Sequence, residues 1–138
     1  MKLNPYLTFN GCAEEATAFY SGVFNGTVNN LTRYSDCTCL PNIPDEYKQK
    51  ILHLCFTIGE TSIGISDTPP DAPADFGHLG HALTLYCDSM EQIDTIFNSL
   101  KEGGEVKCPL SKVFFAERYG EIVDRFGVLW YLIAGMEE

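Results

Sequence analysis

Two histidines, His78 and His81, lie three residues apart in the segment GHLGHALTLY, and the second begins an alternating apolar run. Neutral imidazole is a common metal ligand, so histidines beside a strand can belong to a metal site. The remaining histidine, His53, lies far away in KILHLCFTIG. Because two residues of a turn at this spacing have no fixed relation between their rings, the pair alone does not predict a site.

The six cysteines are the other residues that could bind a metal or form disulfides. Cys37 and Cys39 are close together in DCTC, but one C-x-C without a second pair is weak evidence for zinc. The others are scattered singly along the chain: Cys12, Cys55, Cys87 and Cys108. We expect the thiols to be reduced, and either buried or incidental.

Composition predicts one globular domain with no affinity for polyanions. The chain has 138 residues, 45% of them hydrophobic and 12% aromatic, which is enough for a well-buried core. Its net charge of −10 argues against nucleic acid and against an anionic membrane surface as partners. It has no apolar run long enough to span a bilayer, and its first residues do not resemble a signal peptide, so we expect a cytoplasmic protein.

The first half of the chain predicts a strand, a helix and three more strands. NPYLTF alternates like a strand, and residues 11–26 place apolar side chains at helical spacing, with Gly26 as the expected C′ residue. Further strands are predicted at 27–34, 50–59 and 61–67. The last two are joined by a tight Gly-Glu hairpin, whereas the segment 35–49, with its two prolines, predicts a loop.

The second half repeats this order. A strand at 81–87 precedes a helix at 89–104, in which Ser89 and Gln92 form a capping box and Gly103 ends the helix. Three strands follow at 105–110, 114–124 and 128–135. Because the two halves superpose element by element, we predict an α+β fold of two βαβββ modules, at about 1–67 and 79–138, with a linker at about 68–78.

The whole chain resembles the PhnB-like branch of the vicinal oxygen chelate superfamily, which includes glyoxalase I, bleomycin-resistance proteins and extradiol dioxygenases. The resemblance is carried by LNPYLTFNGCAEEATAFYSGVF and by a C-terminal motif, for which the matching residues are Phe115, Arg118, Tyr119, Gly120, Asp124, Phe126, Gly127, Val128 and Trp130. It implies cupped mixed sheets with helices outside, and homodimers with pockets in the cups. The branch has carried a demethylubiquinone methyltransferase label, but nothing in the motif resembles an S-adenosylmethionine site.

The resemblance also implies where a metal would bind, since metal-using members take ligands from the first and last strand of each module. The corresponding positions are Pro5, a position near Gly64, His81, and Tyr131 or Trp130. Only His81 is a usual ligand, and one histidine does not make a zinc or nickel site. We therefore expect no catalytic metal and no other cofactor, although a divalent ion stays possible.

Five side chains are candidates for lining a pocket: His53, His81, Arg118, Trp130 and Tyr131. His53 shares a strand face with Cys55, and is either a pocket acid or base or a hydrogen-bonded structural histidine. Arg118 could clamp a carboxylate or phosphonate, or could instead pair with Asp124 or another acid. Trp130 and Tyr131 point to opposite faces of their strand, so one of them faces the cup.

Three functions remain open. The first is a small-molecule-binding homodimer that lacks the full metal site, for example a sequestering protein. The second is a metal-assisted lyase, isomerase or dioxygenase acting on a small oxygenated substrate. The third is an accessory protein with a vestigial pocket. The fold does not decide among them, because it supports several chemistries.

Overall fold

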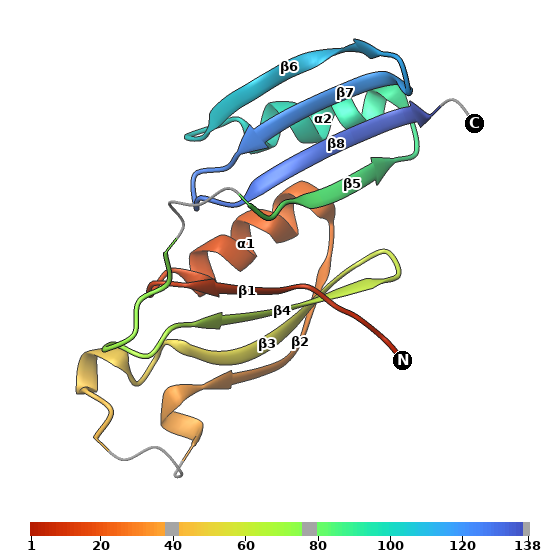
Figure 1. Ribbon diagram of the computed structural model, residues 1–138. Coiled ribbons are helices and arrows are strands. Elements are labelled where there is room, and N and C mark those ends of the chain that lie inside the picture. The colour runs from red at the N-terminus through yellow and green to blue at the C-terminus, as the bar shows by residue number, and fades with distance from the viewer. Residues whose placement is uncertain (38–41, 76–79, 137–138) are drawn as a thin grey trace. The chain divides into compact units, whose positions relative to one another are not determined.

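The computed structural model describes residues 1–37, 42–75 and 80–136. The chain forms two compact units, Met1–Ala74 and Asp75–Glu138, so the division falls within the segment expected to be a linker. Each unit contains one helix packed on a four-stranded mixed sheet (Figure 1). This is the predicted α+β fold with two βαβββ modules.

Within unit 1 the elements are β1 (Tyr6–Phe9), α1 (Ala13–Phe24), β2 (Thr27–Arg33), β3 (Ile51–Ile58) and β4 (Thr61–Asp67), with short 3-10 helices at Tyr34–Asp36 and Asp45–Tyr47. Within unit 2 they are β5 (Leu83–Cys87), α2 (Met90–Leu100), β6 (Glu105–Val113), β7 (Ala116–Val123) and β8 (Leu129–Met136). The strand orders are β1-β4-β3-β2 and β5-β8-β7-β6. In each sheet the first strand runs parallel to the last and the other neighbours are antiparallel, as a duplication would give.

Each sheet has one face covered by the helix of its own unit and one face turned away from it, which we call the helix-free face. In unit 1 the helix side carries the buried apolar side chains Phe9, Leu54, Phe56, Ile63 and Ile65. In unit 2 a side-chain atom at Gly120 would meet the ring of Phe97 from α2, which places Gly120 on the helix side. Because side chains alternate along a strand, Tyr119 and Glu121 belong to the helix-free face.

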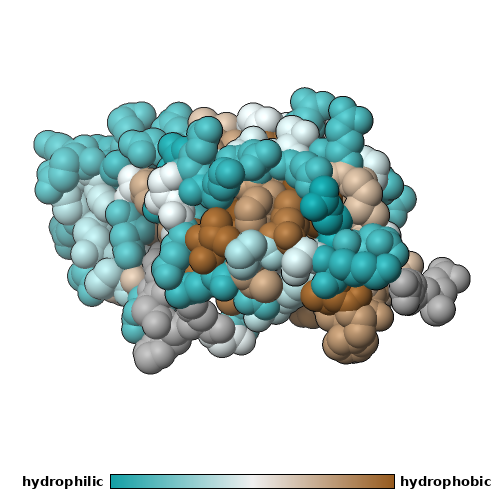
Figure 2. Space-filling view, turned by 90° about the horizontal axis from the view of Figure 1, so that it is seen from above, coloured by the Kyte–Doolittle hydropathy of each residue, from teal (hydrophilic) through white to brown (hydrophobic). Residues whose placement is uncertain are grey.

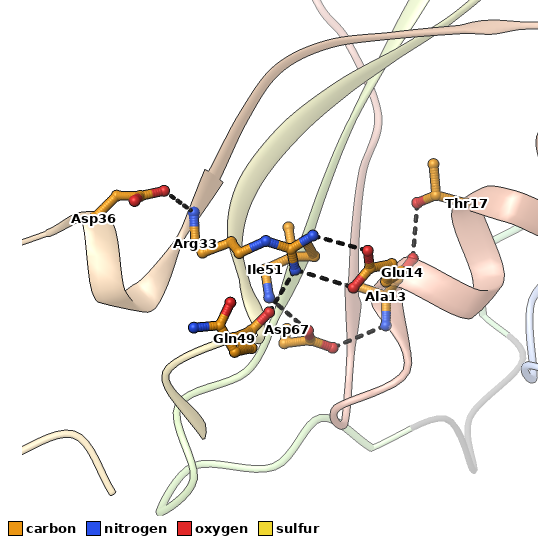
Figure 3. Close-up of polar contacts among 8 residues, drawn as sticks. All are labelled: Ala13, Glu14, Thr17, Arg33, Asp36, Gln49, Ile51 and Asp67. Atoms are coloured by element: carbon orange, nitrogen blue, oxygen red, sulfur yellow. Dashed lines mark hydrogen bonds and ion pairs between the residues drawn. The ribbon is translucent and has the colours of Figure 1, made fainter. Parts of the chain in front are cut away.

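Asp67 ties the start of α1 to the sheet (Figure 3). Its carboxylate is 2% exposed and accepts hydrogen bonds from the backbone N–H groups of Ala13 and Ile51, each at 2.9 Å. Asp67 is the last residue of β4, and it satisfies donors at the ends of two other elements.

An ion pair joins the edge strand β2 to α1. The guanidinium of Arg33 donates to both carboxylate oxygens of Glu14, at 2.8 and 3.0 Å, and also to the backbone oxygen of Gln49 (Figure 3). The pairing with Arg33 lowers the pKa of Glu14 from its ordinary value, with the hydrogen bond as the main cause. Arg33 is therefore committed to structure and is not a free cation for a ligand.

Asp124 organises the turn between β7 and β8. Its Oδ1 accepts hydrogen bonds from the N–H groups of Phe126 and Val128, and its Oδ2 accepts from the indole Nε1 of Trp130 at 2.8 Å. Gly127 has a φ of +90°, a backbone conformation that residues other than glycine rarely adopt. The motif that carries the family resemblance is therefore largely a turn.

The prediction for the start of α2 is confirmed, and the prediction for the end of α1 is corrected. Asn25, not Gly26, takes the left-handed conformation after α1, with a φ of 53°. Gly26 is instead required by close packing, since an added Cβ would lie 2.6 Å from the backbone oxygen of Thr57. At the start of α2, Ser89 accepts from the N–H of Gln92 at 3.0 Å, as predicted.

Candidate functional site

A row of polar side chains crosses the helix-free face of unit 2. The strand register places Thr84 opposite Tyr131, Tyr131 opposite Glu121, and Glu121 opposite Cys108. Directly opposed residues have their Cβ atoms about 4.5–5.5 Å apart, so the four side chains are neighbours. This row contains a carboxylate, a phenol, a hydroxyl and a thiol on one sheet face.

Tyr119 adds a second phenol to this row and bonds to its carboxylate. Its hydroxyl donates to Oε1 of Glu121 at 2.6 Å, and its ring lies 6.2 Å from that of Tyr131 and 5.3 Å from that of Phe115. Burial raises the pKa of Tyr119 far above its ordinary value, and the hydrogen bond to Glu121 and its charge add to the effect. The phenol is therefore a fixed donor at neutral pH, beside a carboxylate that can accept further hydrogen bonds.

The helix-free face of unit 1 carries a different cluster. Tyr6 and His53 stack with ring centroids 5.8 Å apart, and the Tyr6 hydroxyl lies 3.0 Å from Nδ1 of His53. The Sγ of Cys55 lies 3.8 Å from the other ring nitrogen, Nε2. The predicted sharing of one face by His53 and Cys55 is thus found, with Tyr6 as a third member that the sequence analysis missed.

The strand registers make the two faces comparable. Thr8 pairs with Ser66 in unit 1 as Thr84 pairs with Tyr131 in unit 2. Leu54 pairs with Ile65 on β4, so the register extended by one residue aligns His53 with Ser66, just as Glu121 lies opposite Tyr131. His53 and Glu121 therefore occupy equivalent positions in the two modules. The same alternation that marked His53 could have identified Glu121, two residues after Tyr119.

Two of the sequence-predicted pocket residues lie on the helix side instead. Arg118 forms an ion pair with Asp94 of α2 at 2.9 Å, and Trp130 is 2% exposed with its indole bonded to Asp124. Neither side chain is on the helix-free face, so an anion clamp by Arg118 in a cup has no support from its position. Of Trp130 and Tyr131, it is Tyr131 that faces away from the helix.

The positions expected to hold a metal do not form a donor set. Pro5 has no donor side chain, and Gly64 lies under the ring of Tyr6. His81 is exposed and precedes β5 by two residues, whereas Tyr131 is opposite Thr84. Three residues of extended chain correspond to about 10 Å, too far for a shared ion with ligands at about 2 Å.

Among the residues that the structure describes, no group of three or more His, Cys, Asp or Glu side chains could hold a metal ion. His78 and Cys39, which were also considered, lie outside the described residues. The available donors do not fit a catalytic metal, and we derive no chemical step through one.

The cysteines differ from one another in state. Cys12, Cys55, Cys87 and Cys108 are free thiols, whereas Cys37 is disulfide-bonded, so the expectation that all thiols are reduced is wrong at Cys37. Burial, followed by the charges of Asp67 and Glu15, raises the pKa of Cys12. Burial and Asp88 raise the pKa of Cys87 to about 11. These two thiols are consequently poor nucleophiles at neutral pH.

The fold is that of the glyoxalase/bleomycin resistance/dioxygenase superfamily. A domain of this superfamily from Frankia sp. EAN1pec superposes with a TM-score of 0.69 at 14% identity, covering 98% of this chain and 97% of that one. A fosfomycin resistance protein, FosX from Listeria monocytogenes, superposes with a TM-score of 0.67 at 18% identity, covering 99% and 93%. At these identities the likeness shows the fold alone.

The chain can also be assigned to one family within this superfamily. The sequence model of the family described as 3-demethylubiquinone-9 3-methyltransferase matches residues 1–133, and the chain belongs to that family, the PhnB-like branch. Protein PA1353 from Pseudomonas aeruginosa is 34% identical, with a TM-score of 0.87 and 99% of both chains covered. A PhnB protein from Bacillus cereus is 27% identical, with a TM-score of 0.81 and 98% and 100% covered. YjdN from Escherichia coli is 25% identical over 143 residues, covering 96% of this chain and 94% of its own.

Proposed function

We propose that the protein binds a small organic molecule without a resident metal, on the helix-free face of unit 2. The observation that carries the proposal is the row from Thr84 through Tyr131 and Glu121 to Cys108, with the phenol of Tyr119 bonded to Glu121. Pockets that bind small molecules combine aromatic side chains with a few placed polar groups, and this face has both.

The chemistry of this face favours a planar ligand with hydrogen-bond donors. The rings of Phe115, Tyr119 and Tyr131 offer surfaces on which an aromatic ring can stack. The carboxylate of Glu121 accepts hydrogen bonds, so it favours a hydroxyl or an ammonium group and repels a phosphonate. A hydroxylated or amine-bearing aromatic compound is the ligand class that fits, and the net charge of −10 points the same way.

Ligand titration of tag-free protein tests the proposal, with thermal shift and calorimetry against phenols, aromatic amines and aliphatic phosphonates. Glu121→Gln keeps the shape of the side chain and removes its charge, and Tyr131→Phe keeps the ring and removes its hydroxyl. Losing a charge-assisted hydrogen bond weakens binding about 10- to 100-fold. The matched control is Glu105→Gln, on the edge strand β6, which should bind as tightly as wild type.

Two outcomes would contradict the proposal. One is binding that is equally tight in Glu121→Gln and wild type. The other is stoichiometric Zn, Ni, Mn or Fe in protein purified without a histidine tag, with ligand binding abolished by its removal. Neither helix that the structure describes is long and apolar enough to cross a bilayer.

We also propose that the protein is a homodimer located in the cytoplasm. Support for the dimer comes from the edge strand β2, where the apolar side chains of Val28 and Leu31 are 40% and 44% exposed. Figure 2 shows, on the face that it views, apolar surface surrounded by hydrophilic side chains, a pattern that is common at association sites. Light scattering should give twice the chain mass of 15.4 kDa, and the single mass would refute the dimer. Cell fractionation tests the location.

A further inference from the structure

We propose that Cys55 is a nucleophilic thiol that adds to small α,β-unsaturated carbonyl compounds, with His53 as its general base and Tyr6 as the residue that orients the imidazole. This site is built from residues of unit 1, whereas the row is built from residues of unit 2, so its chemistry does not depend on the ligand proposed above. Its elements are a nucleophile, a base and an orienting group in hydrogen-bond contact, which is the arrangement that activates a cysteine.

The geometry assigns each role. Cys55 and His53 lie two residues apart on β3, so both side chains are on the helix-free face, with Sγ 3.8 Å from Nε2. The second ring nitrogen, Nδ1, is 3.0 Å from the hydroxyl of Tyr6. In the state that accepts a proton from the thiol, Nδ1–H donates to the Tyr6 oxygen and Nε2 presents its lone pair to Sγ.

The ring of Tyr6 can lie in its position because Gly64, its partner on β4, has no side chain. Tyr6 is paired with Gly64, and a Cβ on Gly64 would come within 2.3 Å of the ring, so only glycine lets the ring lie there. Gly64 is also paired with Cys55, which places the flat ring beside the thiol. Thr32 lies opposite His53 on β2 and carries no titratable group. Tyr6 and Cys55 are the titratable residues whose side chains contact the His53 ring among the contacts described above.

The surroundings indicate the class of electrophile. The Tyr6 ring offers a flat apolar surface for a conjugated molecule, and Asn29 lies directly opposite Cys55 on β2 with an amide that can donate to a carbonyl oxygen. In the reaction the thiol proton passes to Nε2 while Sγ bonds to the β-carbon. The π electrons of the C=C bond move onto the carbonyl oxygen, and the imidazolium returns the proton to the α-carbon. The thiol S–H is thereby added across the double bond, with no leaving group, oxidant or reductant.

The other free cysteines of the chain serve as an internal comparison for the reactivity of Cys55. Cys12 and Cys87 are held as thiols by their raised pKa values, and Cys108 donates its thiol hydrogen to the carbonyl of Pro109. Cys55 is the thiol in contact with a histidine among these four. We therefore expect Cys55 to react first.

The experiment measures modification by substoichiometric N-ethylmaleimide, an α,β-unsaturated dicarbonyl, with peptide mass mapping over a pH series. Cys55 should be labelled at least about tenfold faster than Cys12, Cys87 or Cys108, and His53→Gln should reduce its rate about tenfold or more. The pH profile of the wild-type rate should differ from that of His53→Gln. Tyr6→Phe keeps the ring and should lower the rate less.

The control is Cys87→Ser, which should leave labelling of Cys55 unchanged. Circular dichroism checks that each variant is folded, and the ranking of the cysteines in wild type needs no variant at all. If Cys108 is labelled as fast as Cys55 in wild type, or if the rate and pH profile of Cys55 are the same in His53→Gln, the proposal is overturned.

Discussion

The contact between Asp124 and Trp130 should contribute a measurable coupling energy to the stability of the fold. Asp124 is 3% exposed, and its carboxylate accepts from the indole of Trp130 and from the N–H groups of Phe126 and Val128. A hydrogen bond to a buried charged group contributes about 1.5–3 kcal/mol. Since the N–H of Phe126 is only partly buried and can turn to water, Asp124→Ala should cost about 3–5 kcal/mol.

Asp124→Asn separates these contributions. The amide oxygen can still accept from the turn, but its NH₂ group then faces the indole N–H, so the variant should lose about 2–3 kcal/mol. In a Trp130→Phe background there is no indole donor to oppose, and the same substitution should cost about 1.5–2 kcal/mol less. The chain has one tryptophan, so urea unfolding must be followed by far-UV circular dichroism.

Asp71→Asn is the surface control, because Asp71 is exposed, and it should stay within about 0.5 kcal/mol of wild type. A coupling between Asp124→Asn and Trp130→Phe below about 0.5 kcal/mol would refute the reasoning, because pairs that do not interact add within that margin. The carboxylate would then serve the turn alone.

Three further outcomes are expected. Asp67→Ala leaves two buried N–H groups without an acceptor, at the starts of α1 and β3, and should lower the free energy of unfolding in urea by about 3–4 kcal/mol. A loss below about 1 kcal/mol would contradict this. Gly64→Ala should push the ring of Tyr6 away from His53 at a cost of about 1–3 kcal/mol, and should change the chemical shifts of the His53 imidazole in NMR. Because the pKa of Tyr119 is raised in the folded state, its contribution to stability is complete below the ordinary tyrosine pKa and declines as pH rises above it; Tyr119→Phe should flatten that alkaline decline, and an identical slope in both proteins would refute it.

Local sequence rules predicted the elements well. The alternation in KILHLCFTIG correctly placed His53 and Cys55 on one face of β3, and Ser89 was recognised at the start of α2 from its spacing to Gln92. These features depend on residues a few positions apart, whose relation is set by strand or turn geometry. The duplication was visible for the same reason, since each module repeats the same local order.

Contacts between distant residues were not predictable in the same way. Arg118 pairs with Asp94, which is 24 residues away, and Asp67 reaches Ala13 and Ile51 across the sheet. Such partners depend on which face of the sheet the helix covers, and the sequence contains many acids that could have served. The contact between Tyr6 and His53 spans 47 residues and requires a glycine on the strand between them.

The equivalence of His53 and Glu121 explains why the two modules can differ in chemistry while sharing a fold. A parallel pair formed by the first and last strands, extended by an antiparallel neighbour, brings three side chains into line on the helix-free face of each sheet. In unit 1 that line holds Thr8, Ser66 and His53, and in unit 2 it holds Thr84, Tyr131 and Glu121. Each line has two hydroxyl groups and, at its end, one strong proton acceptor, whereas a zinc site needs three or four strong ligands. Each module therefore has one equivalent position for a proton acceptor, and its residue decides the chemistry. In unit 1 His53 activates the thiol of Cys55, whereas in unit 2 Glu121 holds the phenol of Tyr119 as a donor.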